Sequence, residues 1–351
     1  MSASGAGAAH VLVARLDSDG DVLLTGPAVR AVASEADRVS YLCSPRALAA
    51  ARLLPGVDDT VAFEAPWVAA DPPPLAPREV TDLVERLASL HIDRALVMTS
   101  FHQSPLPLAL LLRMAGVPRI AAISVDYPGT LLDVRHAVPD DVHEVERNLS
   151  LAAAFGYHLP EGDGGRLQVL RRPGSRPAGL PTDPYVVVHP GASVPARAWS
   201  PERNAELVGS LAGAGWPVVV TGGPSERELC ALVAAGAPGG GTLDLGGAVD
   251  LQGLAEVLAG AAVVVVGNTG PAHLSAAVGT PVVSLFAPTV PAARWRPWRV
   301  PHLLLGDQDI ECAGCRARVC PLEGQPCLGG VEVDEVVLAV GDLARQKREA
   351  A

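Results

Sequence analysis

Three aspartates crowd one short turn near the start of the chain. An apolar run ends at Leu16, and the residues that follow read DSDGD, with Gly20 between Asp19 and Asp21. An Asp at the start of a helix could cap it and gain from the helix dipole. Neighbouring carboxylates also raise one another's pKa, which suits proton abstraction by one of them. Asp17, Asp19 and Asp21 therefore predict either helix caps or a general base.

Glycine turns at the ends of two later apolar runs could bind phosphate groups. His189–Ser193 reads HPGAS, and such a turn can present backbone N–H groups to an anion. Arg197 follows, and it could neutralise a diphosphate through a bidentate contact or could be a surface residue. Thr221–Glu226 reads TGGPSE. Glu226 could accept hydrogen bonds from a ribose or a base, or could simply favour the start of the next helix.

A third turn follows the apolar run VVVV and reads GNTGPAH over Gly267–His273. Thr269 and Gly270 leave backbone N–H groups free at the start of a helix, which is a ready anion site. Pro271 suits the first helical position because its missing N–H would have had no partner there. His273 falls in the first turn of that helix, where it could bind a phosphate or a sugar, or could be structural.

Four cysteines lie close together in the last part of the chain, at Cys312, Cys315, Cys320 and Cys327. Their spacing is C-x2-C-x4-C-x6-C. Four thiolates so spaced could hold a structural zinc ion or an iron–sulfur cluster. The alternative is a compact loop, with a disulfide that forms only during purification.

Two α/β halves must position these residues, because short apolar runs alternate with helical patterns along the chain. The predicted strands are Val11–Leu16, Val39–Leu42, Thr60–Phe63, Ala95–Met98, Ile120–Val125, Tyr185–His189, Val218–Thr221, Thr242–Leu245, Val263–Val266, Val282–Phe286 and His302–Leu305. The predicted helices are Val22–Ser34, Glu79–Leu90, Leu106–Met114, Asp140–Phe155, Pro201–Ala214, Ser225–Ala235, Leu251–Ala259, Pro271–Val278 and Val333–Lys347. We expect two Rossmann-like, doubly wound parallel-sheet domains that face a cleft, with ligands at the carboxyl ends of the strands.

The domain boundaries follow from a stretch rich in proline and glycine, RRPGSRPAGLPTDP, which leaves little room for a helix or strand. We therefore predict an N-terminal domain over residues 1–172, a linker over 173–184 and a C-terminal domain over 185–330. Residues 331–351 form a final helix that could pack back on the N-terminal domain.

Composition and charge exclude several classes of protein. Of the 351 residues 49% are hydrophobic and only 19% are charged, which excludes a disordered chain. Acidic residues outnumber basic ones by 38 to 27, so a partner nucleic acid is not expected. The start of the chain lacks the basic region of a signal peptide, and no apolar run is long enough to span a membrane. We expect a cytoplasmic protein with at most peripheral membrane contact.

Together these segments resemble glycosyltransferase family 9, the ADP-heptose heptosyltransferases, which have the two-domain GT-B fold. The resemblance is carried, in order, by VLVARLDSDGDVLLTGPAVRAV, VVVHPGASVPARAWSPERNAEL, VVVTGGPSERE, VVVVGNTGPAHLSAAVGTPVVSLFAPT and ECAGCRARVCPLEGQPC. It spans nearly the whole chain. It implies that the N-terminal domain binds the acceptor and that the C-terminal domain binds a nucleotide-sugar donor.

The resemblance also assigns roles to single residues. It makes Asp21 the catalytic base, with Asp17, Asp19 and Gly20 as support in the first loop. It makes Arg197 the cation for the diphosphate, where the family often has Lys. The remaining donor contacts map to Ser193, Glu226, Asn268, Thr269, Gly270 and His273. Asn268 departs from the family, which commonly has Asp there; the amide can still bond a hydroxyl but carries no charge.

The reaction implied is an inverting transfer of a heptose, or a related sugar, from an ADP-sugar to an acceptor hydroxyl. Arg197 and the N–H groups at Thr269 and Gly270 would stabilise the developing charge on the diphosphate, so catalysis requires no cofactor. The acceptor could be a glycolipid, a glycan or a small natural product. Two alternatives stay open, a nucleotide-sugar epimerase of GT-B architecture and a non-catalytic sugar-binding protein.

Overall fold

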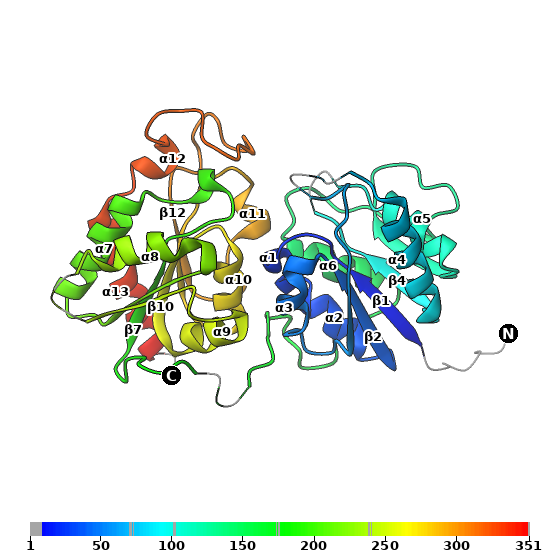
Figure 1. Ribbon diagram of the computed structural model, residues 1–351, viewed down its shortest axis with the longest axis horizontal. Coiled ribbons are helices and arrows are strands. Elements are labelled where there is room, and N and C mark those ends of the chain that lie inside the picture. The colour runs from blue at the N-terminus through cyan, green and yellow to red at the C-terminus, as the bar shows by residue number, and fades with distance from the viewer. Residues whose placement is uncertain are drawn as a thin grey trace. The chain divides into compact units, whose positions relative to one another are not determined.

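The computed structural model describes residues 9–69, 72, 74–100, 103–172, 174, 176–237, 239 and 241–349 (Figure 1). The chain divides into two compact units between Leu170 and Arg171. The prediction that no signal peptide opens the chain falls on residues 1–8, which lie outside the described residues. So do Pro173 and Ser175 of the predicted linker. In the part of the chain that is described, no helix is long and apolar enough to cross a membrane.

The N-terminal unit is built on one parallel sheet in the order β3-β2-β1-β4-β5-β6. Its strands are β1 His10–Ala14, β2 Arg38–Cys43, β3 Asp59–Ala62, β4 Arg94–Val97, β5 Arg119–Ile123 and β6 Val134–His136. This is the doubly wound order, in which the chain reverses direction across the sheet between β1 and β4. Loops that follow these two strands therefore meet at the switch point, where such sheets bind ligands.

Six α-helices accompany these strands in the described part of the N-terminal unit: α1 Asp19–Leu23, α2 Gly26–Ala33, α3 Leu48–Ala51, α4 Pro77–Ser89, α5 Leu106–Met114 and α6 Glu144–Ala154. The sequence predicted one helix over Val22–Ser34, but the structure breaks it into α1 and α2. Pro27 explains the break, since it lies in the first turn of α2 and has no N–H to continue a helix from before it.

The C-terminal unit repeats the same architecture with the sheet order β12-β11-β10-β7-β8-β9. Its strands, all paired in parallel, are β7 Tyr185–His189, β8 Val218–Gly222, β9 Thr242–Gly246, β10 Ala261–Gly267, β11 Val282–Leu285 and β12 His302–Leu305. Its helices are α7 Pro201–Gly213, α8 Arg227–Ala234, α9 Leu251–Gly260, α10 Gly270–Ala277, α11 Ala292–Trp295, α12 Pro326–Gly329 and α13 Val333–Glu349. The switch point of this sheet lies between β7 and β10.

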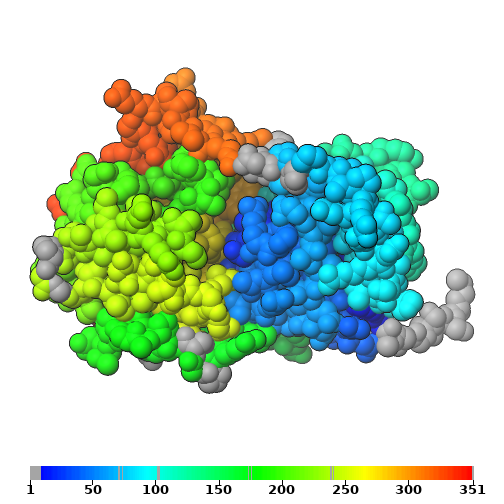
Figure 2. Space-filling view, viewed as in Figure 1, coloured from blue at the N-terminus to red at the C-terminus, as the bar shows by residue number. Residues whose placement is uncertain are grey.

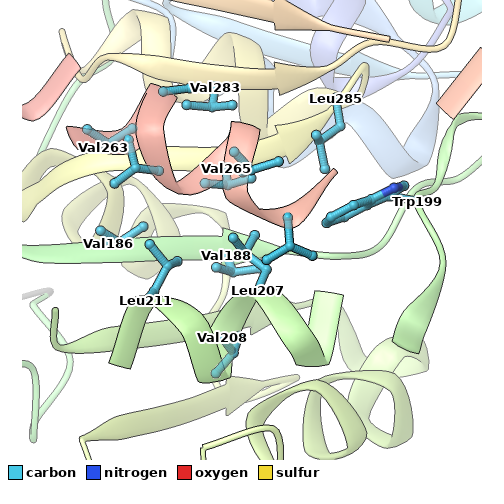
Figure 3. Packing of buried hydrophobic residues seen from close by; sticks show 14 of the residues in the cluster. Val186, Val188, Trp199, Leu207, Val208, Leu211, Val263, Val265, Val283 and Leu285 are labelled. Carbon is cyan, nitrogen blue, oxygen red and sulfur yellow. The ribbon is translucent and has the colours of Figure 1, made fainter. Parts of the chain in front are cut away.

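Valine-rich strands form the core of the C-terminal unit, as Figure 3 shows. A parallel sheet is covered on both faces, so its strands are continuous apolar runs, and β-branched valines suit the extended backbone. Helix α13 completes this core, because Val336, Val340 and Leu343 lie on one helix face and are at most 1% exposed. The sequence left open that this final helix packs on the N-terminal domain. Within the C-terminal unit, the apolar face of α13 is buried against β10 and β11.

Candidate active site

A fully buried arginine organises the first loop of the N-terminal unit. Arg15 follows β1 directly, and its backbone N–H still donates to Leu42 of β2 over 2.9 Å. Its guanidinium donates to three carboxylates: Nε to Asp17 Oδ2 at 2.8 Å, Nη2 to Asp21 Oδ1 at 3.0 Å and Nη1 to Glu144 Oε2 at 3.2 Å. We call these four residues the Arg15 cluster.

Asp21 is held on both of its carboxylate oxygens. Oδ1 accepts from Arg15, and Oδ2 accepts from the Ser18 hydroxyl at 2.8 Å. Ser18 is also the N-cap of α1, since its Oγ lies 3.4 Å from the backbone N of Asp21. The Asp21 side chain keeps 18% of its surface exposed. The loop therefore presents a carboxylate in fixed orientation at the carboxyl end of β1, where the sequence predicted a base.

Asp17 lies deeper and shares Arg15 with Asp21. Its Oδ1 accepts from Nε2 of Gln103, in the loop after β4, at 2.6 Å. Burial raises the pKa of Asp17 to about 6, and the charge of Asp21 adds to this, although Arg15 and the Gln103 hydrogen bond oppose it. Asp17 therefore binds a proton more tightly than an exposed aspartate does. Gln103 shows how the loops after β1 and β4 meet at the switch point.

Glu144 and Arg147 extend the cluster into helix α6. Glu144 is the first residue of α6, has no exposed surface, and also lies 3.3 Å from Nε of Arg147. Neither residue was singled out from the sequence, because Glu144 is 129 positions from Arg15 and belongs to an ordinary helical pattern. Arg15 did leave a signal, a lone charge within the apolar run VLVARL.

Asp19 does not belong to the Arg15 cluster. It is the first residue of α1, and burial raises its pKa to about 6, opposed by the charge of Arg46 and a backbone hydrogen bond from Ala50. Its Oδ1 is buried and has no hydrogen-bond partner among the described residues. Gly20, beside it, is buried. The structure therefore brings Asp17 and Asp21 together but turns Asp19 away from them.

In the C-terminal unit, Glu226 is fixed against the turn after β7. Its Oε2 accepts from the backbone N of Gly223 at 2.6 Å. A Cβ built on Gly191 would come within 1.9 Å of its Oε1, so the close approach requires glycine at that position. The same Oε2 lies 3.9 Å from Nε2 of His189, whose Nδ1 lies 3.0 Å from the hydroxyl of Thr221. Burial lowers the pKa of His189, although Glu226 opposes this, so the imidazole is neutral at pH 7.

Arg197 lies beside the turn that precedes α10. Its Nε donates to the hydroxyl of Thr289, after β11, at 3.0 Å. A Cβ on Gly267 would come within 2.8 Å of the backbone oxygen of Arg197, so the two predicted donor segments pack backbone to backbone. Ser193, in the turn before Arg197, is exposed. Thr289 was not singled out from the sequence.

The turn before α10 buries an unpartnered amide. Asn268 is 4% exposed, and its Nδ2 has no hydrogen-bond partner among the described residues. Thr269 is the N-cap of α10 but makes no side-chain capping bond, and Gly270 is the first helical residue. His273 is buried in the first turn. Since buried polar groups are normally hydrogen-bonded, this turn has donors available for an anionic or hydroxylated ligand.

The comparisons with known proteins decide the family. The model of glycosyltransferase family 9 (heptosyltransferase) matches residues 80–325. The chain belongs to glycosyltransferase family 9. It is similar to lipopolysaccharide heptosyltransferase 1 of Pseudomonas aeruginosa, with 34% identity over 238 residues, 65% of this chain and 64% of that relative. The match thus spans less than two thirds of the relative's length.

Two solved structures share the fold of this family 9 chain. ADP-heptose lps heptosyltransferase II of E. coli gives a TM-score of 0.74 at 18% identity, over 97% of this chain and 99% of that one. A family 9 glycosyltransferase from Veillonella parvula gives 0.77 at 17% identity, over 96% and 97%. With the two doubly wound sheets, these likenesses confirm the predicted GT-B fold.

The four cysteines, all among the described residues, are not gathered as metal ligands in this structure. Cys312 and Cys315 are exposed in a segment, orange in Figure 2, that stands out on the surface of the C-terminal unit, whereas Cys327 is buried in its core. Within the described ranges, no three His, Cys, Asp or Glu side chains are arranged to hold a metal ion. The residues present therefore do not fit the zinc or iron–sulfur site that the spacing allowed. Burial raises the pKa of the Cys327 thiol, and the nearby Cys320, Cys312 and Cys315 raise it further.

Proposed function

We propose that this family 9 chain is an inverting glycosyltransferase that moves a heptose, or a related sugar, from an ADP-sugar donor to an acceptor hydroxyl. One observation carries the proposal. Asp21 lies at the carboxyl end of β1, with Oδ1 held by Arg15 and Oδ2 by Ser18, and part of its surface stays exposed. A general base needs this combination of fixed orientation and access to its substrate.

In the proposed reaction, Asp21 removes the proton of the acceptor hydroxyl. The acceptor oxygen then forms a bond to the anomeric carbon of the donor sugar. The bond between that carbon and the diphosphate oxygen breaks on the opposite face, and ADP leaves with the electron pair. The configuration at the anomeric carbon is inverted because attack and departure occur on opposite faces.

The C-terminal unit supplies the groups that the donor needs. Arg197 carries the positive charge for the diphosphate, and the N–H groups at the start of α10 add donors beside it. Packing of Gly267 on the backbone of Arg197 keeps these two groups together. Glu226 accepts hydrogen bonds from the ribose. These residues can neutralise the leaving diphosphate themselves, so the reaction we propose requires no metal cofactor.

The names of the relatives support ADP-heptose as the donor. They leave several classes of acceptor open. The E. coli structure of the same fold is an ADP-heptose enzyme, and the Pseudomonas relative is a lipopolysaccharide heptosyltransferase. We propose ADP-heptose as donor, and as acceptor a hydroxyl of a glycolipid, a glycan or a small natural product.

Release of ADP that depends on an acceptor tests this function. The full chain is incubated with ADP-heptose, with and without a panel of glycolipid core, oligosaccharide and small-molecule acceptors. ADP is quantified, and the product's anomeric configuration is read by NMR. We expect ADP to appear at a high rate only with an acceptor, and the new bond to have the configuration opposite to that of the donor.

The two alternatives give different results in the same assay. A nucleotide-sugar epimerase would convert the donor without any acceptor and release no ADP in step with a glycoside. A non-catalytic sugar-binding protein would bind sugar and turn over nothing with any acceptor of the panel. Either result, with donor binding intact, would overturn the proposal.

A further inference from the structure

Burial of the charged side chains of the Arg15 cluster is energetically unfavourable. Arg15, Asp17 and Glu144 have side chains that are 0%, 7% and 0% exposed, and Asp21 alone of the cluster reaches 18%. Burying charges carries a large desolvation penalty that their mutual attraction offsets only in part, and apolar replacements are often as stable. Stability alone therefore does not account for three carboxylates gathered on one buried guanidinium beside the solvent-facing Asp21.

Resting on the proposed function, we propose that Arg15 is a positioning residue for the transfer, and that Asp17 and Glu144 share its charge and so set how strongly Asp21 binds a proton. Each guanidinium nitrogen donates to a different carboxylate, so the orientation of Arg15 is fixed from three directions. Asp17 comes from the loop after β1, and Glu144 from helix α6. Asp21 is therefore held by a group that is itself held by a second residue of the same loop and by helix α6.

The charges of the cluster give the direction of the effect. Arg15 stabilises the ionised form of Asp21 and alone would make it a weak base. Asp17 and Glu144 draw on the same guanidinium and add negative charge, which strengthens proton binding at Asp21. Asp21 has the corresponding effect on Asp17: burial raises the pKa of Asp17, and the charge of Asp21 raises it further. A base needs enough proton affinity to take a hydroxyl proton, and the cluster supplies it.

The other titratable and polar groups near the Arg15 cluster do not take over the effect of Arg15, Asp17 and Glu144 on the proton affinity of Asp21. Burial lowers the pKa of Arg15, but the charges of the three carboxylates outweigh this effect and raise the pKa above its ordinary value, so Arg15 stays charged. Burial raises the pKa of Tyr41, on β2, so that the phenol stays neutral. Arg147 pairs with the second oxygen of Glu144, and the neutral Gln103 donates to Asp17. Arg15 donates a hydrogen bond to each of the three carboxylates.

The test compares pH profiles of kcat/KM for acceptor-dependent ADP release in the full chain. Asp17→Asn keeps a carbonyl oxygen for Nε of Arg15 and removes the charge. We expect its acid limb to move to lower pH by about 0.5–1 unit, because Asp21 then binds a proton more weakly, with a loss of about 3- to 30-fold at the optimum. Glu144→Gln should move the limb in the same direction.

The arginine variants test positioning directly. Arg15→Gln should lower kcat about 100-fold or more, and Arg15→Lys should recover part of it, since an ammonium keeps the charge but cannot meet three carboxylates in one plane. Affinity for ADP, measured by calorimetry, should stay within about twofold of the parent, because the nucleotide contacts that we propose belong to the C-terminal unit. Arg78→Gln, at an exposed position of α4, is the matched control.

The outcomes separate this inference from the proposed function. If Asp21→Asn abolishes transfer while Asp17→Asn and Glu144→Gln keep the parent pH profile, the inference is wrong and the function stands. If Asp21→Asn keeps full activity, the proposed base is wrong, whatever the cluster does. Should Arg15→Gln fail to fold, which circular dichroism reports, Asp17→Asn and Glu144→Gln still decide the matter.

Discussion

Nη2 of Arg15 lies 3.0 Å from Oδ1 of Asp21, and this contact joins a buried charge cluster to a carboxylate that reaches solvent. The other two partners of Arg15 are shielded: the side chains of Asp17 and Glu144 are 7% and 0% exposed. Of these three carboxylates Asp21 is therefore the one best placed to meet a substrate. The resemblance to family 9 assigned the base to Asp21, and the structure adds the groups that hold its carboxylate.

Replacing Asp21 by asparagine should separate catalysis from binding. The amide keeps the shape of the side chain but cannot accept the acceptor's proton, so transfer should fall about 100- to 10,000-fold. ADP affinity, measured by calorimetry, should not change. Glu35→Gln, exposed after α2, is the control for loss of one negative charge. Transfer at the parent rate in the Asp21 variant would show that another group takes the proton.

Asp19→Asn should stabilise the protein at neutral pH. Burial raises the pKa of Asp19 from 3.8 to about 6, so the folded state binds the proton more tightly than the unfolded state. The contribution of this group is favourable below about pH 4 and is lost as pH rises through about 6. At about pH 7.5 the ionised carboxylate, whose buried Oδ1 has no hydrogen-bond partner among the described residues, destabilises the fold, and asparagine removes that charge.

Thermal unfolding measures this effect as a difference between two pH values. The Asp19→Asn variant should raise Tm by about 2–6 °C near pH 7.5, and the gain should vanish near pH 4. Asp37→Asn, at an exposed position, should have the Tm of the parent chain at both pH values. A variant that is less stable than the parent near pH 7.5 would mean that the Asp19 charge is compensated in the folded state.

The fold was largely predictable because its signals are local. Apolar runs such as VVVH and VVVVG mark buried parallel strands, and glycine turns mark where they end. The strand β6, Val134–His136, was missed because it is three residues long, lies at the sheet edge and has a half-exposed pattern. Single turns such as α3, Leu48–Ala51, are equally hard to find, since four residues carry no helical period.

Residues of the candidate site could be predicted only where their pattern lies within a single turn of the sequence. Asp21, Arg197 and the residues around Gly270 belong to segments whose pattern is visible in one stretch of sequence. Glu144 and Gln103 were missed because they reach the first loop from other elements, and nothing near them in the chain marks that contact. Tertiary contacts of this kind require the sheet order, which places the loops after β1 and β4 side by side.

Gly191→Ala should weaken donor binding through Glu226. A Cβ at Gly191 would lie 1.9 Å from Oε1 of Glu226, so the carboxylate must leave its hydrogen bond with Gly223. Loss of the charge-assisted hydrogen bond that we propose between Glu226 and the ribose should raise the Kd for ADP about tenfold. Gly213→Ala is the matched control, because nothing outside the adjoining backbone lies within 4 Å of the added Cβ. Unchanged ADP affinity in Gly191→Ala would exclude Glu226 from the donor site.

Arg197→Gln should impair both donor binding and transfer. Hydrogen bonds to a charged group contribute about 1.5–3 kcal/mol, so the Kd for ADP should rise about 10- to 100-fold. Transfer should fall by more than that, since the diphosphate gains charge as it leaves. Arg197→Lys should recover part of both effects, because an ammonium keeps the charge but not the planar fork. Arg203→Gln, in the first turn of α7, is the matched surface control.

The Arg197 variants also test whether a metal ion helps to neutralise the charge of the diphosphate. If protein groups neutralise the diphosphate, an excess of EDTA should leave the transfer rate of the parent chain within about twofold, and added Mg²⁺ should not restore Arg197→Gln. A metal-bound diphosphate would give the opposite pattern, with activity lost on chelation and the variant rescued by the cation. The comparison must be made at constant ionic strength, because salt alone weakens the contact between a guanidinium and a phosphate.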